Sequence, residues 1–369
     1  HGKLLKCISN CFLPNHFSLS EDRMKNNLDQ WPEPFVRVQS LSESCLSSIP
    51  LRYVKPSHDR PSINITNSGI SIPVIDLAGL DGNDKKLAAS VAEKIDLACK
   101  TWGFFQVVNH GVDLNLMNTT RELWLKFFHC PMEVKQAYAN SPLTYEGYGS
   151  RVGVRKDALL DWSDYYFLHY LPQNEKDFNK WPAISDNFRE VVDEYGKEML
   201  ELGRRLMRVL SANLGLEESS LWSAIGGDEV GSSLRVNYYP KCPQPDLTLG
   251  LSPHSDPGVI TLLSPGDVVG LQVKKDGEWI PVKPASHAFI VNVADQLQVL
   301  SNAIYKSVEH RVIVNSDVER LTFAYLLNPK GTVPISPVKE LLTPETLPLY
   351  KPMTFDEYRR YIRVIGDER

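Results

Sequence analysis

Residues 306–329, KSVEHRVIVNSDVERLTFAYLLNP, decide the fold class, because they read as two β-strands separated by a polar turn. Side-chain character alternates along both halves, which is the period of a strand with two different faces. Asn315-Ser316-Asp317 supplies the turn residues between them. If the two strands form a hairpin that closes at residues 315–319, His310 and Arg320 both point into the same interior.

The same alternation continues upstream, in short segments separated by turn residues. Lys275-Asp276-Gly277-Glu278 predicts a tight hairpin, because Asp-Gly suits a type I′ turn. The expected strands are 232–240, 259–264, 270–275, 278–284 and 288–293. Many short strands at this spacing favour a sandwich or barrel. We therefore expect an α+β protein whose core is a double-stranded β-helix, a cupin-like jelly roll, flanked by helices.

Helical periods dominate outside this strand-rich region. KKLAASVAEKIDLACKTW (85–102) predicts one helix, and residues 353–365 predict a closing one. Residues 1–23 read as an irregular leader upstream of Met24. The expected organisation is a largely irregular N-terminal arm (1–70), an α/β region (71–185), a long connecting helix (186–215), the jelly-roll domain (216–335) and a C-terminal helical segment (336–369).

Composition, net charge and cysteine content exclude several classes of protein. The chain has 369 residues, of which 42% are hydrophobic, and a formal net charge of -5. The negative charge argues against nucleic acid or an anionic membrane as a partner. No apolar run approaches the ~20 residues that span a bilayer. Six cysteines without framework spacing, and no secretory signal, favour a reducing compartment, most simply the cytosol.

A candidate metal site lies in GLSPHSD (250–256) and KSVEHRV (306–312). His254 and Asp256 are two residues apart, so on a strand they share a face, and His310 follows on a later strand. Two histidines and one carboxylate form the facial triad of non-haem Fe(II) oxygenases. A zinc enzyme could use similar ligands. However, zinc chemistry gives no reason for the inward-facing Arg320.

Two rows of polar residues should face the same interior as the metal. Arg320 and Thr322 share a face of their strand, and Arg235, Asn237 and Tyr239 share a face of LRVNYYP (234–240). An unpaired buried arginine costs several kcal/mol, so a ligand carboxylate is the natural partner of Arg320. Tyr239 can donate a hydrogen bond to an acidic ligand. Arg235 can bind a second anion or form an internal salt bridge.

Each of these signals has a simpler explanation when it stands alone. A histidine and an aspartate two residues apart are common in loops, and a buried histidine such as His310 is more often a core residue than a ligand. Arg320 alone is usually half of an ion pair. His110, at the end of a predicted strand, is interpreted as structural. The combination of the three ligands with Arg320, in this order on strands, makes coincidence a poor explanation.

With these residues placed, the chain resembles the plant 2-oxoglutarate- and Fe(II)-dependent dioxygenases. IPVIDL (72–77), WGFFQVVNHGV (102–112), NYYPKCPQP (237–245) and GLQV (270–273) occur in the family's order together with the metal and arginine motifs. The resemblance implies His254, Asp256 and His310 as iron ligands. It also implies a 2-oxoglutarate site, for which we name Arg320, Thr322, Tyr239 and Asn237. Thr322 stands where most members have serine.

Within that family, the chain is most similar to the jasmonate-induced oxygenases, which hydroxylate jasmonic acid at C12. The similarity lies in WPEPFVRVQSLSES (31–44), TYEGYGSR (144–151), LDWSDYYFLHYLP (160–172) and LYKPMTFDEYR (349–359). It implies that two arginines hold the jasmonate carboxylate. The residues expected to contact the substrate are Arg235, Arg359, Phe355, Tyr148 and Leu326. Leu326 departs from the subgroup, which has phenylalanine there.

The resemblance therefore implies a hydroxylase that converts jasmonic acid to 12-hydroxyjasmonic acid with O2, inactivating a hormone of plant defence. Fe(II) and 2-oxoglutarate would be required, with ascorbate as a supporting reductant, and no side chain beyond the iron ligands would be catalytic. Flavonoid oxidases such as anthocyanidin synthase are the alternative, although they have lysine at the position of Arg235 and glutamate at that of Asn328. More distant alternatives are a zinc isomerase or hydrolase and a silent hormone-binding protein. The sequence leaves the oligomeric state open, with a monomer as the simplest expectation.

Overall fold

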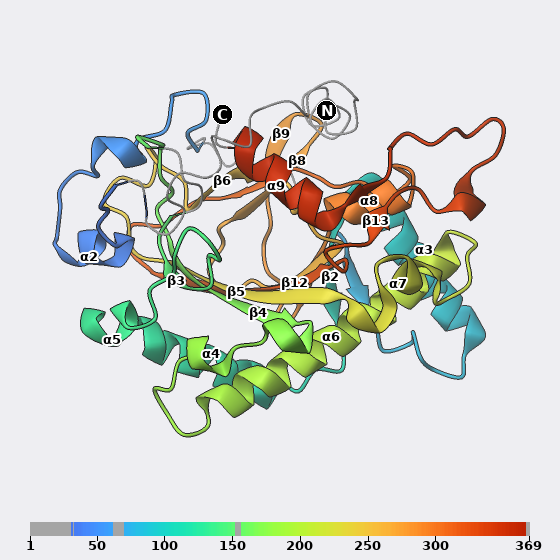
Figure 1. Cartoon of the computed structure of the whole chain (residues 1–369), viewed down its shortest axis with the longest axis horizontal. Helices are drawn as coiled ribbons and strands as arrows, with labels where there is room; N and C mark the ends of the chain where they lie inside the picture. Colours follow the sequence, from blue (N-terminus) through green and yellow to red (C-terminus); the bar gives the residue numbers. More distant parts are fainter. Residues whose placement is uncertain (1–30, 32, 62–69, 152–155, 367–369) are drawn as a thin grey trace.

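The computed structural model describes residues 31, 33–61, 70–151 and 156–366, and two β-sheets form its centre (Figure 1). The expected leader, residues 1–23, lies outside the described residues. The larger sheet has eight strands, in the order β1 (Val74–Asp76), β2 (Phe104–Val108), β10 (Phe289–Val293), β7 (Ile260–Ser264), β12 (Arg320–Asn328), β5 (Gly231–Tyr239), β4 (Asp164–Leu171) and β3 (Gly147–Gly149). The smaller sheet has the order β6 (Leu251–His254), β11 (His310–Val312), β8 (Leu271–Lys275) and β9 (Glu278–Pro281).

Helices cover the outside of the larger sheet, as Figure 1 shows for α4 and α6. The helices are α2 (Val38–Glu43), α3 (Lys85–Thr101), α4 (Leu114–Phe128), α5 (Met132–Gln136), α6 (Phe188–Asn213), α7 (Ser220–Ala224), α8 (Asp295–Leu300) and α9 (Phe355–Gly366). A two-stranded sheet of β13 (Pro334–Ile335) and β14 (Met353–Thr354) precedes α9. The expected α+β jelly roll flanked by helices is confirmed.

The predicted pairing of the two strands in 306–329 was wrong. β11 pairs with β6 and β8 in the smaller sheet, whereas β12 pairs with β5 and β7 in the larger one. The segment 313–319 therefore crosses from one sheet to the other. The alternation in the sequence identifies the face of each side chain but not the partner of the strand. The predicted Asp276-Gly277 hairpin is confirmed, since β8 and β9 pair around it and both turn residues have positive φ.

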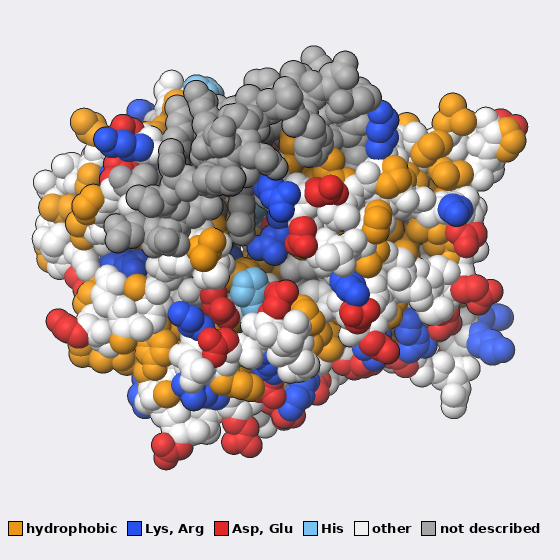
Figure 2. All heavy atoms as spheres, in the orientation of Figure 1, with side chains coloured by type: hydrophobic (Ala, Val, Ile, Leu, Met, Phe, Trp, Pro, Cys, Tyr) orange, Lys and Arg blue, Asp and Glu red, His pale blue; other side chains and the backbone are white. Residues whose placement is uncertain are grey.

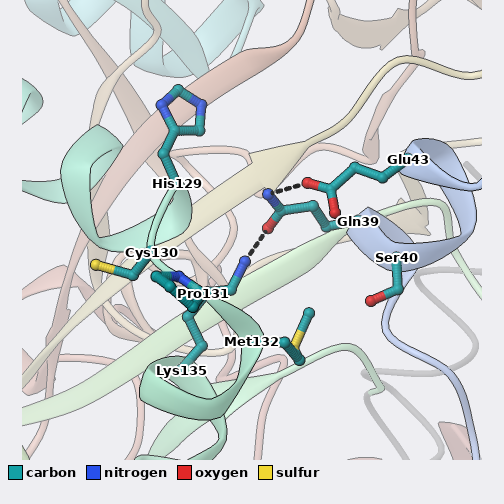
Figure 3. A pocket seen from close by; sticks show the side chains of 8 residues that line it. All are labelled: Gln39, Ser40, Glu43, His129, Cys130, Pro131, Met132 and Lys135. Carbon is teal, nitrogen blue, oxygen red and sulfur yellow. Dashed lines mark hydrogen bonds between the residues drawn. The ribbon is translucent and has the colours of Figure 1, made fainter.

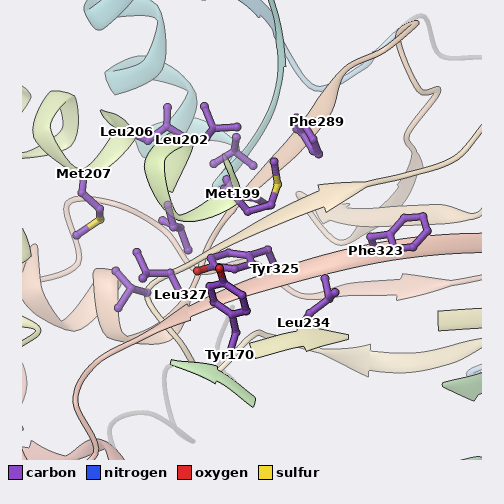
Figure 4. Close-up of a cluster of buried hydrophobic side chains, with 14 of the residues drawn as sticks. Tyr170, Met199, Leu202, Leu206, Met207, Leu234, Phe289, Phe323, Tyr325 and Leu327 are labelled. Carbon is purple, nitrogen blue, oxygen red and sulfur yellow. The ribbon is translucent and has the colours of Figure 1, made fainter. Parts of the chain in front are cut away.

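The outer face of the larger sheet packs on α6 and forms the main apolar core. Phe323, Tyr325 and Leu327 of β12 are at most 2% exposed and lie on the same side as Leu234 of β5. Figure 4 shows these residues together with Met199, Leu202 and Leu206 of α6. The long amphipathic helix covers this face because its apolar stripe runs along nearly its whole length.

The interior between the two sheets is divided into an apolar part and a polar part. Phe104, Leu271, Val273 and Ile290 are among the buried residues of a separate apolar cluster. The polar part lies along β5 and β12, where the inward-facing residues alternate with the outer core residues. The space between the two sheets is therefore lined by apolar side chains in one part and by polar side chains in the other.

The described part of the N-terminal arm contributes more to the core than the sequence indicated. Val38 and Tyr53 are 0% and 2% exposed, and the rings of Tyr53 and Trp162 lie 5.3 Å apart. The backbone amides of Val38 and Gln39 both donate to the carboxylate of Asp164, each at 3.0 Å. The described part of the arm contains helix α2 and a short 3-10 helix at Leu51–Tyr53, and its side chains complete a core cluster with the barrel.

On the face shown in Figure 2, acidic and basic side chains are interspersed rather than separated. Within the described part of the chain, no helix is both long and apolar enough to span a membrane.

Candidate active site

His254, Asp256 and His310 meet in the interior between the two sheets. His254 ends β6 and His310 begins β11, and the two residues are direct partners in the smaller sheet. Their Nε2 atoms lie 3.5 Å and 3.6 Å from Oδ1 of Asp256. Three donor atoms at this spacing can all reach one ion through bonds of about 2.1 Å. The three residues predicted as metal ligands are therefore close enough together to hold one metal ion.

The two imidazoles are oriented by backbone carbonyl groups. Nδ1 of His254 lies 2.8 Å from the carbonyl oxygen of Ser252, and Nδ1 of His310 lies 3.3 Å from that of Val308. A proton on each Nδ1 leaves Nε2 as the lone-pair donor, an arrangement common in metal-bound histidines. Burial, with a contribution from His254, lowers the pKa of His310 to about 4. His310 is therefore neutral at pH 7 and able to coordinate a metal.

Asp256 is oriented by two side chains that sequence reasoning missed. Its Oδ2 accepts hydrogen bonds from Thr261 Oγ1 at 2.5 Å and Asn292 Nδ2 at 2.6 Å, while Oδ1 faces the histidines. Burial opposes ionisation, but the two histidines and these hydrogen bonds hold the pKa of Asp256 well below its usual range. Thr261 and Asn292 are paired residues on β7 and β10. Their polarity within apolar strands was the signal that could have revealed them.

Arg320 is a buried cation whose hydrogen bonding is incomplete. It is 5% exposed, its Nε donates to the carbonyl of Val268 at 2.9 Å, and its guanidinium lies 5.3 Å from the ring of Tyr239. Nη1 is buried and has no partner among the described residues. Burial lowers the pKa of Arg320, and Tyr239 offsets part of this effect. A buried guanidinium lacking a partner fits a site for a ligand carboxylate.

Thr322 and Asn237 lie beside Arg320 in the same inward-facing rows. They are paired residues of β12 and β5, and Asn237 Nδ2 donates to Thr322 Oγ1 at 3.4 Å. Arg320 pairs with Tyr239 one step along the same ladder. The four residues predicted for 2-oxoglutarate are thus brought together.

Arg235 lies farther along β5, on the same face. Its Nε donates to Asn237 Oδ1 at 2.7 Å, and its guanidinium stacks over Tyr165 at 4.3 Å from the ring centre. The pKa of His254 is raised overall. Burial and the charge of Arg235 lower it, but the effect of Asp256 is larger. Contacts with Asn237 and Tyr165 hold Arg235 in the inward-facing row.

Three further predicted residues belong to β12 and α9. Leu326 faces inward and is paired with Thr261, whose hydroxyl holds Asp256. Phe355 begins α9 and is 3% exposed. The guanidinium of Arg359 lies 5.7 Å from the ring of Phe355, one helical turn away. Leu326 therefore lies in the inward row of β12, whereas Phe355 packs in the main apolar cluster with Arg359 beside its ring.

Tyr148 is the predicted substrate residue that the structure does not bring to this site. Tyr148 of β3 is the cross-strand partner of Tyr166 of β4, which in turn is opposite Val236 of β5 and then Phe323 of β12. Because Phe323 is on the outer face of the sheet, Tyr148 is on the outer face too. Its hydroxyl donates to Asp164 at 3.0 Å. A strand of three residues with glycine on both sides of the tyrosine offers too little alternation to assign a face, so the sequence was misleading here.

Asp295 was also missed, although it is close to the metal ligands. It is 3% exposed, and its backbone amide donates to the carbonyl of Asp256 at 2.9 Å. Ser255, Ser307 and Tyr358 all donate to its carboxylate. Burial nevertheless raises the pKa of Asp295 to about 6.

A surface pocket lies away from this site, between α2 and the α4–α5 segment, with a volume of about 390 Å³. Figure 3 shows Lys135 donating to Gln39 and Gln39 donating to Glu43. These polar groups satisfy one another, so the pocket presents no unpaired buried group to a ligand. We assign it no role in the chemistry of the barrel.

The fold and the metal site together define the class of protein. The model of the 2OG-Fe(II) oxygenase superfamily matches residues 230–329, and that of the non-haem dioxygenase in morphine synthesis N-terminal region matches residues 72–184. The chain belongs to the 2OG-Fe(II) oxygenase superfamily and is an oxygenase that uses Fe(II) and 2-oxoglutarate.

Particular relatives narrow this class. Jasmonate-induced oxygenase 2 of Arabidopsis thaliana is 57% identical over 96% of this chain and 96% of its own length. Flavanone 3-dioxygenase 2 of Oryza sativa subsp. japonica is 40% identical over 87% of this chain and 92% of its own. The crystal structure of JOX2 in complex with 2OG, Fe and JA has a TM-score of 0.85 and 60% identity, covering 91% of this chain and 95% of that one.

Proposed function

We propose that this protein hydroxylates jasmonic acid at C12, with 2-oxoglutarate as co-substrate. The observation that carries the proposal is Nη1 of buried Arg320, which has no partner in the described part of the chain and lies in the same interior as His254, Asp256 and His310. The crystal structure of JOX2 with 2OG, Fe and JA supports the same pair of small molecules for this chain. Regiochemistry at C12 follows from the similarity to the jasmonate-induced oxygenases.

The iron would be held by His254 Nε2, His310 Nε2 and Asp256 Oδ1. Arg320 would bind the distal carboxylate of 2-oxoglutarate, assisted by the hydroxyl groups of Thr322 and Tyr239. When bound, Fe(II) supplies the activation of O2, which converts 2-oxoglutarate to succinate and CO2 and places one oxygen atom on the substrate. Ascorbate would serve as the supporting reductant.

The chain's own residues have the task of positioning the substrate. Arg235 and Arg359 would bind the jasmonate carboxylate, and the apolar side chains of Phe355 and Leu326 would contact its hydrocarbon part. We assign no acid–base role to a side chain, because the iron held by His254, Asp256 and His310 would supply the oxidising chemistry. Correct placement of the target carbon is therefore the protein's main contribution to the rate.

A flavonoid is the alternative substrate class, since flavanone 3-dioxygenase 2 shares the family. Two residues favour an acid instead. Arg235 offers a cation on the inward face of β5, and the neutral side chain of Asn328 stands at the end of β12. A carboxylate substrate would form an ion pair with Arg235, which a neutral polyphenol cannot form.

The test is a turnover assay with Fe(II), 2-oxoglutarate, ascorbate and O2, offering jasmonic acid and a flavanone in parallel. We expect a product 16 mass units heavier than jasmonic acid, formed with one succinate per product. Asp256→Ala, which removes an iron ligand, is the control for background oxidation. Flavanone conversion without jasmonate conversion would refute the proposed substrate. Jasmonate binding without succinate, by protein shown to contain iron, would instead indicate a silent hormone-binding protein.

A further inference from the structure

Asp295, the first residue of α8, connects three segments that surround the proposed active site. Its Oδ2 accepts hydrogen bonds from Tyr358 Oη at 2.6 Å and from Ser255 Oγ at 3.2 Å. Its Oδ1 accepts one from Ser307 Oγ at 2.6 Å. The carboxylate is buried, so these hydroxyl groups replace the water that would otherwise solvate it.

Two of these segments carry the metal ligands. Ser255 stands between His254 and Asp256, and the backbone amide of Asp295 also donates to the carbonyl of Asp256 at 2.9 Å. Ser307 is three residues before His310. Asp295 is thus bonded on both sides to the chain segments that place the three ligands.

The third segment is α9, which carries Arg359 and Phe355. Tyr358 is 4% exposed and reaches Asp295 across 63 residues of sequence. Figure 1 shows α9 lying beside α8 and β13. A further contact of α9, the hydrogen bond from the Asp356 amide to Gly331, lies in its first turn. Tyr358 adds a buried hydrogen bond one turn into the helix, next to Arg359.

We propose that the Tyr358–Asp295 hydrogen bond is a positioning contact that fixes the helix carrying Arg359 relative to the loop carrying His254 and Asp256. This inference rests on the proposed function, in which Arg359 binds the substrate carboxylate. A molecule clamped by α9 then has its target carbon at a set distance from the metal. Small displacements of a bound substrate reduce rates strongly, so a short buried hydrogen bond to a carboxylate suits this role.

The test compares Tyr358→Phe with a matched control, Tyr350→Phe. Tyr350 accepts a hydrogen bond from Gln298 of the same helix α8, at 3.1 Å, so Tyr350→Phe removes a hydroxyl that contacts α8 through a different residue. In Tyr358→Phe, we expect the KM for jasmonic acid to rise about tenfold, the order expected from loss of one hydrogen bond to a charged group. Less hydroxylated product should form per succinate, while the KM for 2-oxoglutarate stays within about twofold of wild type. Tyr350→Phe should retain the wild-type KM and product ratio.

A double-mutant cycle with Arg359→Ala separates positioning from general stability. If Tyr358 acts through Arg359, adding Tyr358→Phe to Arg359→Ala should raise the KM for jasmonic acid no further. Independent losses that multiply in the double variant would overturn the proposal. Equal losses in Tyr350→Phe and Tyr358→Phe would overturn it as well, since they would show a structural effect common to both tyrosines.

Hydrogen exchange of the substrate-free protein distinguishes failure of this inference from failure of the proposed function. We expect faster amide exchange in residues 358–366 of Tyr358→Phe than of wild type or Tyr350→Phe. Unchanged exchange there would refute the positioning contact, whatever the substrate is. Faster exchange in a protein whose wild type does not convert jasmonic acid would refute the proposed substrate and leave the link between α9 and the metal loop standing.

Discussion

The two faces of the β5–β12 strand pair differ in whether their side chains find partners within the protein. On the outer face, Phe323 and Tyr325 pack against helices and other strands and are 2% and 0% exposed. On the inner face, Arg320 is almost as deeply buried but keeps a guanidinium nitrogen without a partner among the described residues. One face is complete without a ligand, and the other is not.

Because side chains alternate along a strand, the outer face of this pair can stabilise the fold while its inner face binds ligands. Each outward side chain contributes burial free energy, whereas the inward-facing Arg320 has lost water without full compensation from the described residues. Substitutions on the two faces should therefore affect different measured properties. Outer-face changes should reduce stability and spare kinetics, and inner-face changes should alter kinetics and spare stability.

Arg320→Ala should give the largest kinetic effect. Loss of the buried cation removes a charged hydrogen-bonding partner worth roughly 3–5 kcal/mol, which corresponds to an increase of about 10²- to 5 × 10³-fold in the KM for 2-oxoglutarate. Iron content should be unchanged, and the melting temperature should stay the same or rise, because an unpaired buried charge is removed. Steady-state kinetics and thermal unfolding test this. Unaltered co-substrate dependence would show that the carboxylate binds elsewhere.

Phe323→Ala should give the largest stability effect. Its ring lies 6.1 Å from that of Tyr195 in α6, and truncation should cost about 3–5 kcal/mol of unfolding free energy. Denaturant unfolding measures the loss, with Phe323→Leu as the control that retains most of the volume. KM values of the protein that remains folded should match wild type. A selective rise in the KM for either substrate would contradict the proposal that outer-face residues affect stability but not substrate binding.

Arg235→Ala should have an intermediate effect, confined to the acidic substrate. Loss of a charge-assisted hydrogen bond of about 1.5–3 kcal/mol predicts a rise of roughly 10- to 100-fold in the KM for jasmonic acid. The methyl ester of jasmonic acid should be affected much less, since its carboxylate is masked. Arg235→Lys retains the charge and should recover part of the affinity. Equal effects on acid and ester would argue against a carboxylate contact.

Leu326→Phe should give the smallest effect. Leu326 lies on the inner face, paired with Thr261, and the larger ring introduces the residue type of the jasmonate-induced subgroup. We expect less than a threefold change in kcat/KM for jasmonic acid, with stability changed by no more than about 1 kcal/mol. Product analysis by mass spectrometry would detect any change in the hydroxylated position. A large loss of activity would show that the pocket is shaped around leucine.

The inward rows of β5 and β12 could be predicted from the sequence because alternation is a local property. Arg235, Asn237 and Tyr239 share a face on any extended strand, as do Arg320 and Thr322. Strand pairing is not local, and this is why β11 and β12 were wrongly expected to form a hairpin.

Residues that support the ligands were harder to find. Thr261 and Asn292 stand in strands that otherwise look like core, and their role depends on Asp256 approaching from another sheet. Asp295 begins a helix of six residues, too short to show a helical period in the sequence. The role of such residues depends on their tertiary contacts and cannot be inferred from the residues adjacent to them in the sequence.

The packing of the N-terminal arm also bears on how the chain folds. Val38 and Tyr53 share a core cluster with Tyr239, Val312 and Val314. Contacts separated by more than 250 residues carry a high loop-closure cost and form slowly. During synthesis, residues near position 40 must wait until about position 314 has emerged before their cluster can close. The contacts of this segment with Trp162 and Asp164 can form earlier, but its cluster is completed only when Val312 and Val314 have been synthesised, so part of its apolar surface stays uncovered until late in translation.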